Sequence, residues 1–189
     1  MPAFPRAELE AMIRRFVATN DACGRTGEWD RLAAFYTEDA IYSWNNGPKY
    51  EFVARGRQQI RDWVMGTEME GLDGWRYPYV RTLIDDQQGE VIGIWRQIAP
   101  VAGEDGRPVE VAGTGGSWFR YAGNFQWSWQ RDFFDTGCAG ALFLELMQKG
   151  QLAPAMEARM KKGAKMPGWV RRSEFDWYET IADREDRRA

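Results

Sequence analysis

Asp132 is the residue of this chain best placed for acid–base chemistry. It lies near the end of the stretch NFQWSWQRDFFD (124–135), in which large aromatic residues alternate with polar ones, and Asp135 follows three residues later. A carboxylate in an apolar, ring-lined pocket is disfavoured in its charged form, so its pKa rises toward the range where it exchanges protons near neutral pH. Asp132 is therefore the candidate general base, whereas Asp135 is predicted to cap a following helix.

The alternation gives this strand two surfaces, because side chains on a strand point to opposite faces with a period of two. With Asp132 pointing into a cavity, the rest of the stretch divides into inward Gln130 and Phe134 and outward Trp129, Arg131 and Phe133. The alternative is structural: Asp132 forms an ion pair with Arg96, Arg120 or Arg131.

The absence of histidine and the small number of cysteines limit the kinds of catalytic and metal-binding site that the chain can form. The chain has no histidine, the commonest general base and metal ligand, so proton transfer falls to Asp, Glu, Tyr, Lys or Cys. Cys23 and Cys138 are too few for a disulfide framework and too far apart in the sequence for a metal pair, and they suit a reducing cytoplasm. We expect no metal and no cofactor.

The composition predicts one ring-rich domain spanning residues 1–189. Of these residues 14% are aromatic, including ten Trp, which is more ring surface than a compact core requires and suits a lined cavity or a subunit interface. The net charge of -3 comes from 25 basic and 28 acidic residues without a basic stripe, so nucleic acid is not an expected partner. No apolar run approaches the length of a membrane span, and we expect a cytoplasmic protein without membrane contact.

Periodicity predicts the elements that position Asp132. Helices are expected at roughly 6–20, 29–36 and 54–64, and TEDA (37–40) ends the second before a first strand at IYSW. Four consecutive antiparallel strands follow, and residues 138–189 form a C-terminal helical extension. This order predicts an α+β fold, a cone-shaped curved antiparallel sheet with the N-terminal helices packed on its concave face. The glycines of GTGGS (113–117) are expected to mark a bulge or bend in the sheet, because they open no helix that could bind phosphate.

Four stretches carry a resemblance to a known family: LAAFYTEDAIYSW (32–44), ARGRQQIRDWV (54–64), GSWFRY (116–121) and WQRDFFD (129–135). Over roughly residues 5–136 the chain resembles the nuclear-transport-factor-2-like (cystatin-like) superfamily, and within it the SnoaL-like branch of polyketide cyclases, dehydratases and epoxide hydrolases. The resemblance implies the cone-shaped fold. It implies no single reaction, since the superfamily includes enzymes and purely binding members alike.

Limonene-epoxide-hydrolase-like members are similar in more detail. Their final strand carries a Trp-Arg-Asp-aromatic-Phe-Asp run whose first Asp acts as a base, and Asp132 holds that place. A tyrosine that orients the nucleophilic water falls on Tyr42. The Arg and second Asp of those members fall on Trp95 and Gln97, so the chain departs from the epoxide-opening triad. Members with a His-Asp dyad, such as the scytalone-dehydratase-like ones, are excluded because histidine is absent.

The residue pattern and the family resemblance together indicate the candidate site. The catalytic candidates are Asp132 for proton transfer, Tyr42 for oxyanion stabilisation and Arg96 to steady an anionic intermediate. The substrate-binding candidates are ring walls and a polar lip at the mouth of the cone: Trp44, Asn45, Lys49, Trp95, Gln97, Trp118 and Phe134.

We therefore expect a cofactor-independent lyase or dehydratase acting on an apolar aromatic or multi-ring small molecule. One example is a lignin-derived diaryl compound that loses water or formaldehyde, a reaction that the resemblance suggests from relatives in aromatic-degrading bacteria. The alternatives are a SnoaL-like cyclase or isomerase, an epoxide hydrolase and, from another class, a non-catalytic ligand-binding module. Rings left on the outer sheet face predict a homodimer or homotrimer. The tail with Trp169, Trp177 and Tyr178 is expected to close either its own cavity or that of a neighbour.

Overall fold

The computed structural model describes residues 3–182 of the chain, and it confirms the predicted α+β class. The N-terminal half begins with a long helix, a 3₁₀ helix and two strands: α1 (Arg6–Thr26), Trp29–Phe35, β1 (Tyr36–Asn46) and β2 (Tyr50–Arg55). A short helix α2 (Arg57–Gln59) then continues as one π-helical turn, Ile60–Val64, and a 3₁₀ turn, Thr67–Met69.

Strands and then helices make up the rest of the described chain. The strands are β3 (Tyr79–Asp85), β4 (Glu90–Trp95), β5 (Ile98–Ala102), β6 (Pro108–Glu110), β7 (Gly115–Gly123) and β8 (Gln126–Phe133). The C-terminal elements are α3 (Thr136–Gln148), α4 (Pro154–Lys162), β9 (Trp169–Arg171) and α5 (Trp177–Ala182). Residues 183–189 of the predicted extension lie outside the described residues.

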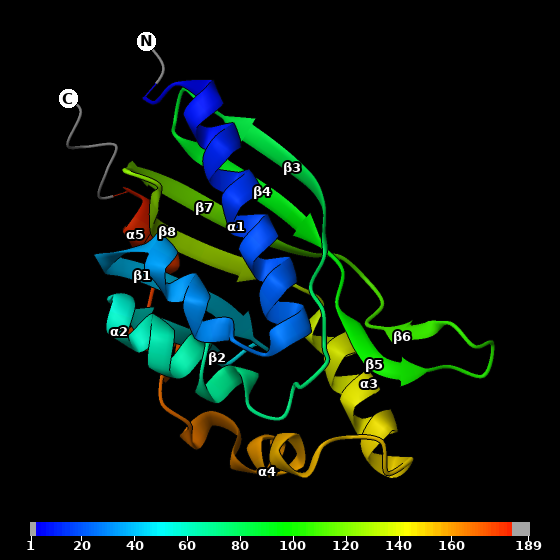
Figure 1. Ribbon diagram of the computed structural model, residues 1–189. Helices are drawn as coiled ribbons and strands as arrows, with labels where there is room; N and C mark the ends of the chain where they lie inside the picture. The colour runs from blue at the N-terminus through cyan, green and yellow to red at the C-terminus, as the bar shows by residue number, and fades with distance from the viewer. Residues whose placement is uncertain (1–2, 183–189) are drawn as a thin grey trace.

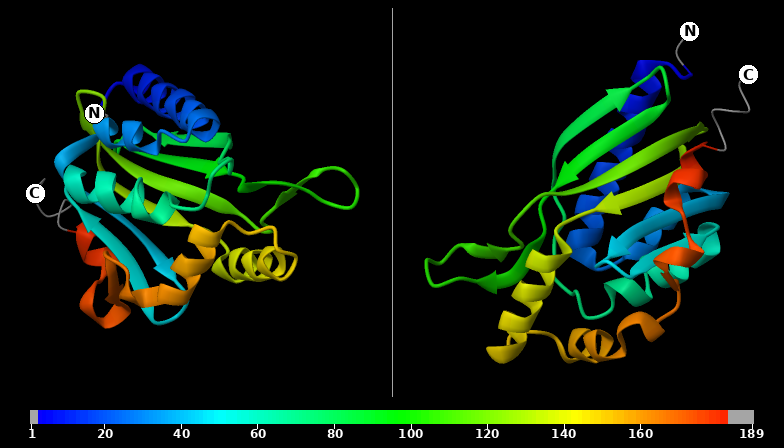
Figure 2. Two further views of the ribbon diagram at one scale, coloured as in Figure 1. Left: turned by 60° about the horizontal axis from the view of Figure 1, so that its bottom comes forward. Right: turned by 180° about the vertical axis from the view of Figure 1, so that it is seen from behind.

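The main sheet is curved and has seven strands in the order β3-β4-β7-β8-β1-β2-β9. Helix α1 lies across its concave face (Figure 1). One adjacent pair, β1 with β8, is parallel, and this pairing sets Tyr42 beside Gln130 and Trp44 beside Asp132. Strands β5 and β6 form a separate hairpin that projects away from the sheet (Figure 2).

Several predicted boundaries were wrong. The second helix ends at Phe35 rather than at TEDA, which lies inside β1, and the predicted lip with Asn45 and Lys49 holds the end of β1 and the turn before β2. The predicted strands are not consecutive in one sheet, because β5 and β6 intervene as a separate hairpin and β7 begins only at Gly115. The first helix is longer than predicted and ends at Thr26, where Gly27, with a positive φ of 77°, forms the C-cap.

The core sits between α1 and the concave face. Leu9, Met12, Ile13 and Phe16 follow the helical period and are all buried. The Phe16 ring makes edge-on contacts with the rings of Phe119 and Trp127, at centroid distances of 5.2 and 6.3 Å. Because each such side chain contributes roughly 1.5–3 kcal/mol on burial, this layer fixes α1 over the sheet.

The C-terminal extension covers both sides of the sheet. Helices α3 and α4 close the open end of the cone (Figure 2), and β9 pairs with β2. Helix α5 packs instead on the outer face, where the Trp129 indole N–H donates to Thr180 Oγ1 at 2.9 Å and Trp118 meets Trp177 edge-on. Part of the ring surface expected at a subunit contact is thus covered by the chain itself, and the homodimer or homotrimer stays a prediction.

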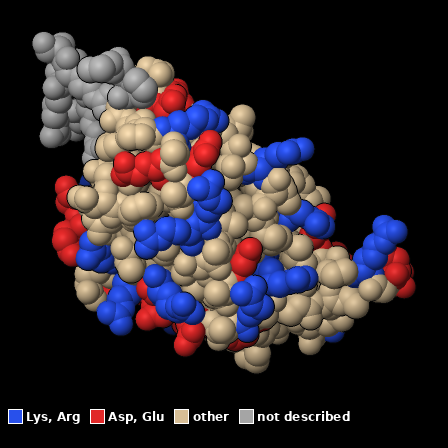
Figure 3. Space-filling view, turned by 45° about the horizontal axis from the view of Figure 1, so that its top comes forward, with Lys and Arg blue, Asp and Glu red and all other residues tan. Residues whose placement is uncertain are grey.

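Charges of both signs are mixed on the surface. Figure 3 shows basic and acidic side chains side by side over one face of the molecule, in keeping with the absence of a basic stripe in the sequence. Within residues 3–182, no helix combines the length and the apolar character that crossing a bilayer requires.

The strand glycines of GTGGS mark close ring packing. A Cβ on Gly115 would lie 2.3 Å from Cζ3 of Trp95 on the inner face, and a Cβ on Gly116 would lie 2.3 Å from Cζ of Phe133 on the outer face. Gly115 therefore lets the Trp95 ring lie flat against β7, where its indole N–H reaches Ser117.

We predict that Gly115→Ala lowers the free energy of unfolding by about 1–3 kcal/mol, because the added methyl displaces the Trp95 ring from a filled space. The matched control is Gly140→Ala in α3, where a Cβ meets nothing within 4 Å, and this change should raise stability by about 0.5–1 kcal/mol. Urea unfolding checks both values. A Gly115→Ala protein as stable as the wild type would contradict the packing argument.

Candidate active site

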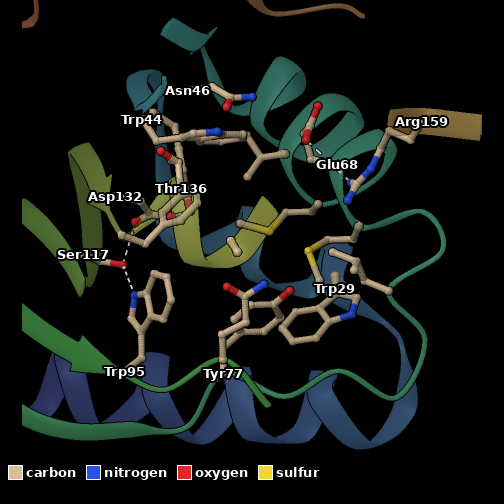
Figure 4. A pocket seen from close by; sticks show the side chains of 18 of the residues that line it. Trp29, Trp44, Asn46, Glu68, Tyr77, Trp95, Ser117, Asp132, Thr136 and Arg159 are labelled. Atoms are coloured by element: carbon tan, nitrogen blue, oxygen red, sulfur yellow. Dashed lines mark hydrogen bonds and ion pairs between the residues drawn. The ribbon is translucent and has the colours of Figure 1, made fainter. Parts of the chain in front are cut away.

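A cavity of about 400 Å³ lies inside the cone beneath α3 and α4. Its walls are mainly apolar and aromatic, including Phe16, Trp29, Trp44, Met69, Trp95, Phe134, Phe143, Met156 and Trp169. The charged side chains among the described lining residues are Asp132, Glu68 and Arg159. Figure 4 shows Asp132 on one side of this space and the other two on the opposite side.

Asp132 is held by three neutral donors. The Tyr42 hydroxyl donates to Oδ2 at 2.6 Å, while the Ser117 hydroxyl and the Gln130 side-chain amide donate to Oδ1 at 2.6 and 2.7 Å. The donors come from β1, β7 and β8, which are neighbours in the sheet. Ser117 lies directly opposite Asp132 in the β7–β8 register, so its side chain shares the inner face.

The donors are themselves oriented by a second set of hydrogen bonds. The Trp95 indole N–H donates to Ser117 Oγ at 2.9 Å, and since the single Ser117 proton goes to Asp132, Tyr79 is the donor in its 3.1 Å contact with Ser117. The Tyr36 hydroxyl donates to Gln130 Oε1 at 2.5 Å, which leaves the amide nitrogen of Gln130 to face Asp132. The network therefore directs its protons toward one carboxylate.

Burial raises the pKa of Asp132 above its ordinary value. The hydrogen bonds from Ser117, Tyr42 and Gln130 act in the opposite direction, because they stabilise the charged form, and the nearby charge of Arg131 adds to them. Burial also raises the pKa of Tyr42 well above the usual value for tyrosine, and the Asp132 charge reinforces that shift. Tyr42 thus stays protonated and acts as a donor.

The structure contradicts an ion pair between Asp132 and an arginine. Arg131 points to the outer face and pairs with buried Glu51 at 3.0 Å, beneath the Trp177 ring. The other two candidates also have partners of their own, Arg120 with Glu90 at 2.8 Å and Arg96 with Glu110. The Arg131 charge that acts on Asp132 therefore lies on the opposite face of the sheet.

Six of the ten residues predicted for the site line the cavity: Tyr42, Trp44, Trp95, Gln97, Asp132 and Phe134. The inward set of Gln130, Asp132 and Phe134 and the outward contacts of Trp129 and Arg131 agree with the predicted alternation. Trp44 stacks on Phe52 with ring centroids 3.8 Å apart, so its ring is a fixed wall. The Asp135 carboxylate accepts from the Cys138 backbone N–H at 2.8 Å, which confirms the helix cap.

Four predicted site residues lie outside the cavity. Trp118 alternates with inward Ser117 and therefore faces outward, where its indole N–H donates to Glu90 at 2.8 Å. Arg96 follows the last residue of β4, is exposed, and pairs with Glu110 at the end of β6. Lys49 is exposed in the turn before β2, and Asn45 points away while its neighbour Asn46 lines the cavity.

Nine polar residues that line the cavity were not predicted as site residues: Asn20, Asn46, Glu68, Tyr77, Tyr79, Ser117, Gln130, Thr136 and Arg159. Pairing of β7 with β8 in register is the signal that locates Ser117, since it sets this residue opposite Asp132. Glu68 and Arg159 come from segments about ninety residues apart that only the tertiary fold brings together. Over residues 3–182, no three potential ligand side chains are grouped to hold a metal ion.

We predict that Asp132→Asn gains stability relative to the wild type as pH rises above about 4, where this carboxyl group ionises in the unfolded chain. Because the folded chain holds the Asp132 proton more tightly than the unfolded chain, the wild type loses stability as this group ionises, whereas the variant does not. Urea unfolding across this pH range measures the difference.

The control makes the same chemical change three residues away. The pKa of Asp135 is lowered by its hydrogen bonds to Cys138, so Asp135→Asn should lose stability relative to the wild type as pH rises toward about 4, below the range in which Asp132→Asn gains it. A pH-independent difference for Asp132→Asn, or one with the sign of the Asp135→Asn series, would contradict the burial argument.

Comparison with known proteins places this geometry in a family. A family model described as a SnoaL-like domain matches residues 5–140. No functionally curated protein is similar enough in sequence to be matched. Among solved structures, PrhC from Penicillium brasilianum aligns with a TM-score of 0.58 at 15% identity, covering 81% of this chain and 96% of PrhC.

Two further structures share the fold. A putative SnoaL-like polyketide cyclase from Jannaschia aligns with a TM-score of 0.54 at 13% identity, over 71% of this chain and 90% of the cyclase. An NTF2-like protein from Anabaena variabilis aligns with a TM-score of 0.53 at 15% identity, over 71% and 95% of the two chains. The chain therefore belongs to the SnoaL-like domain family, within the nuclear-transport-factor-2-like superfamily.

Proposed function

We propose that the protein is a proton-transfer enzyme, a lyase or dehydratase that acts without a cofactor on an apolar aromatic or multi-ring small molecule. The observation that carries the proposal is the Asp132 carboxylate, which borders an apolar cavity and is held by neutral donors only. A carboxylate whose pKa is raised by burial and that has no ion-pair partner in the cavity can both take a proton and return it.

Asp132 has an acceptor position left for the substrate. A carboxylate accepts about four hydrogen bonds, two on each oxygen. Oδ1 already accepts from Ser117 and Gln130, whereas Oδ2 accepts from Tyr42 alone. The remaining position on Oδ2, beside the Tyr42 hydroxyl, is therefore where a substrate proton is received.

The elimination step follows from these two groups. Asp132 Oδ2 takes a proton from a carbon next to a carbonyl or a conjugated ring, and the electron pair of that C–H bond forms the new double bond. The bond to the leaving hydroxyl breaks, and that group departs as water with the proton that Asp132 has just received. Tyr42, which remains protonated, donates to the oxyanion that develops on the conjugated system.

Loss of formaldehyde uses the same groups with a different bond broken. Asp132 takes the proton of a hydroxymethyl group, its carbon leaves as formaldehyde, and the electron pair of the broken carbon–carbon bond passes into the conjugated system. That carbanion is reprotonated by Asp132. Charge delocalisation into an aromatic ring is what makes either route accessible to a weak base.

The walls favour a flat, apolar substrate. Trp44, Trp95 and Phe134 surround the Asp132 end of the cavity, and planar rings pack well against planar ligands. Helices α3 and α4 lie at the open end of the cone (Figure 2), and Phe143 and Met156 from these helices line the cavity. A bound substrate that displaces water from the cavity strengthens the hydrogen bonds that guide proton transfer.

The alternatives differ in what they require. A cyclase or isomerase uses the same base and differs only in the fate of the carbanion. Epoxide hydrolysis by the limonene-type mechanism requires a second carboxylate beside the base, and Trp95 and Gln97 occupy the corresponding places. A binding module requires the cavity but no ionisable Asp132.

We predict that Asp132→Asn lowers kcat by about 10²–10⁴-fold while ligand affinity is kept, because the amide preserves the shape of the site but cannot take a proton. The assay incubates the protein with diaryl compounds bearing hydroxymethyl groups, hydroxylated polycyclic ketones and epoxides. Mass spectrometry follows loss of water or of a one-carbon fragment.

The control is again Asp135→Asn, which keeps a good helix-capping residue outside the cavity and should retain wild-type turnover. Full turnover by Asp132→Asn would place the base elsewhere. Tight binding by the wild type without any chemical change, isomerisation included, would favour the binding module.

A further inference from the structure

The cavity has a second polar end, formed by Glu68 and Arg159. Glu68 belongs to the 3₁₀ turn Thr67–Met69 and Arg159 to α4, and their side chains are only 15% and 11% exposed. Both line the cavity, and Figure 4 shows them across the space from Asp132. The α4 residue comes from beyond the segment 5–140 that defines the family.

The two charges are close but do not satisfy each other. Arg159 Nη1 lies 3.6 Å from Glu68 Oε2, just beyond hydrogen-bond distance, and donates to the Thr67 carbonyl at a long 3.5 Å. Arg159 Nη2 contacts the Met156 sulfur, a weak acceptor, at 2.7 Å. Within the described part of the chain, the guanidinium has no carboxylate oxygen within hydrogen-bond distance.

Glu68 is fixed from its other side. The Trp169 indole N–H donates to Oε1 at 3.0 Å, so Oε1 faces the ring while Oε2 faces Arg159. Burial raises the pKa of Glu68, against the opposing effects of Arg159 and Trp169. A strong acceptor, Glu68, and a strong donor, Arg159, thus lie next to each other in a mostly buried site, and each can form further hydrogen bonds.

A hydroxyl group is the chemical partner that fits this pair. Its oxygen accepts from Arg159 and its proton goes to Glu68 Oε2, so one small group serves both charges. A carboxylate would meet the negative charge of Glu68, and an ammonium group would meet the positive charge of Arg159. A phenol is preferred over an alcohol because its proton is the stronger donor and its ring suits the nearby Trp169 and Met156.

We propose that Glu68 and Arg159 recognise an aromatic hydroxyl of the substrate at the end of the cavity opposite Asp132. The substrate class is then a phenolic multi-ring compound whose hydroxylated ring lies under α4 while its reacting carbon lies at Asp132. The inference rests on the proposed function for the reacting end only, since recognition of the hydroxyl involves no turnover.

The test measures binding of four probes that share one scaffold: biphenyl, para-phenylphenol, para-methoxybiphenyl and biphenyl para-carboxylate. Quenching of tryptophan fluorescence reports affinity for the wild type and for the variants Glu68→Gln, Arg159→Met and Asp132→Asn. In the wild type, para-phenylphenol should bind about 10-fold or more tightly than biphenyl and the methyl ether, as a hydrogen bond to a charged group allows.

The variants identify the residues that cause the preference for the phenol. Arg159→Met should abolish the advantage of the phenol, whereas Glu68→Gln should reduce it and raise the affinity for the carboxylate. Asp132→Asn should keep it. Glu104→Gln, the same change at an exposed residue between β5 and β6 that does not line the cavity, is the matched control and should also keep it.

Three results would overturn the inference. The first is a wild type that binds the carboxylate most tightly, and the second is a preference for the phenol that survives Arg159→Met. The third is an equal loss of affinity for all four probes in Glu68→Gln and Arg159→Met, which would mean that the pair only holds α4 in place. Thermal unfolding of each variant, with Arg159→Lys as a conservative second change, separates misfolding from lost recognition. A protein that prefers the phenol but transforms no substrate would count against the proposed function and leave this inference standing.

Discussion

The central constraint of this structure is a carboxylate that borders an apolar cavity without a cation to neutralise it. Asp132 depends on three neutral donors for its charged form, and each donor comes from a different strand of the curved sheet. The arginines close to it in sequence or across the strands are paired with Glu51, Glu90 and Glu110. The period of two along β8 places Arg131 on the far face, so burial and hydrogen bonding have the largest effects on the Asp132 pKa and the Arg131 charge adds a smaller one.

The C-terminal extension gives the common fold of the family its individual site. The matched segment ends at residue 140, early in α3, and the helices beyond it supply the cover of the cavity and Arg159. Of the three tail aromatics, Trp169 lines the cavity of its own chain, while Trp177 packs on the outer face against Trp118. One segment therefore closes the ligand site and also covers rings that would otherwise lie on the surface.

The sequence was most informative where a strict local period operates. Period two on β8 predicted the inward position of Asp132, and the helical period predicted the buried face of α1. Trp118 was assigned to the wrong face because the register between β7 and β8, which puts Ser117 opposite Asp132, is a long-range property. The register between β7 and β8 also shifts at Ser128. Because of this shift Trp127 and Gln130 both point inward, although strict alternation would place them on opposite faces, and no local sequence pattern predicts it.

Arg96 illustrates a second kind of error. Because arginine is positively charged, Arg96 was predicted to stabilise an oxyanion. Strand β4 ends at Trp95, however, and Arg96 lies at the start of the connection to the projecting β5–β6 hairpin, where it is exposed and pairs with Glu110. Conversely, Glu68 and Arg159 lie in a short turn and a late helix with no shared motif. Contacts of this kind follow from packing of the whole chain and are not encoded in any short window.

The most direct test of this account is the titration of Asp132 itself, followed by carbon NMR of protein labelled at the aspartate carboxyl groups. The account predicts that the Asp132 pKa lies above the ordinary carboxyl value of 3.8 and rises further in Tyr42→Phe and Ser117→Ala, because each variant removes a donor to the charged form. A resonance that titrates at or below the ordinary value, or one that neither variant moves, would contradict it.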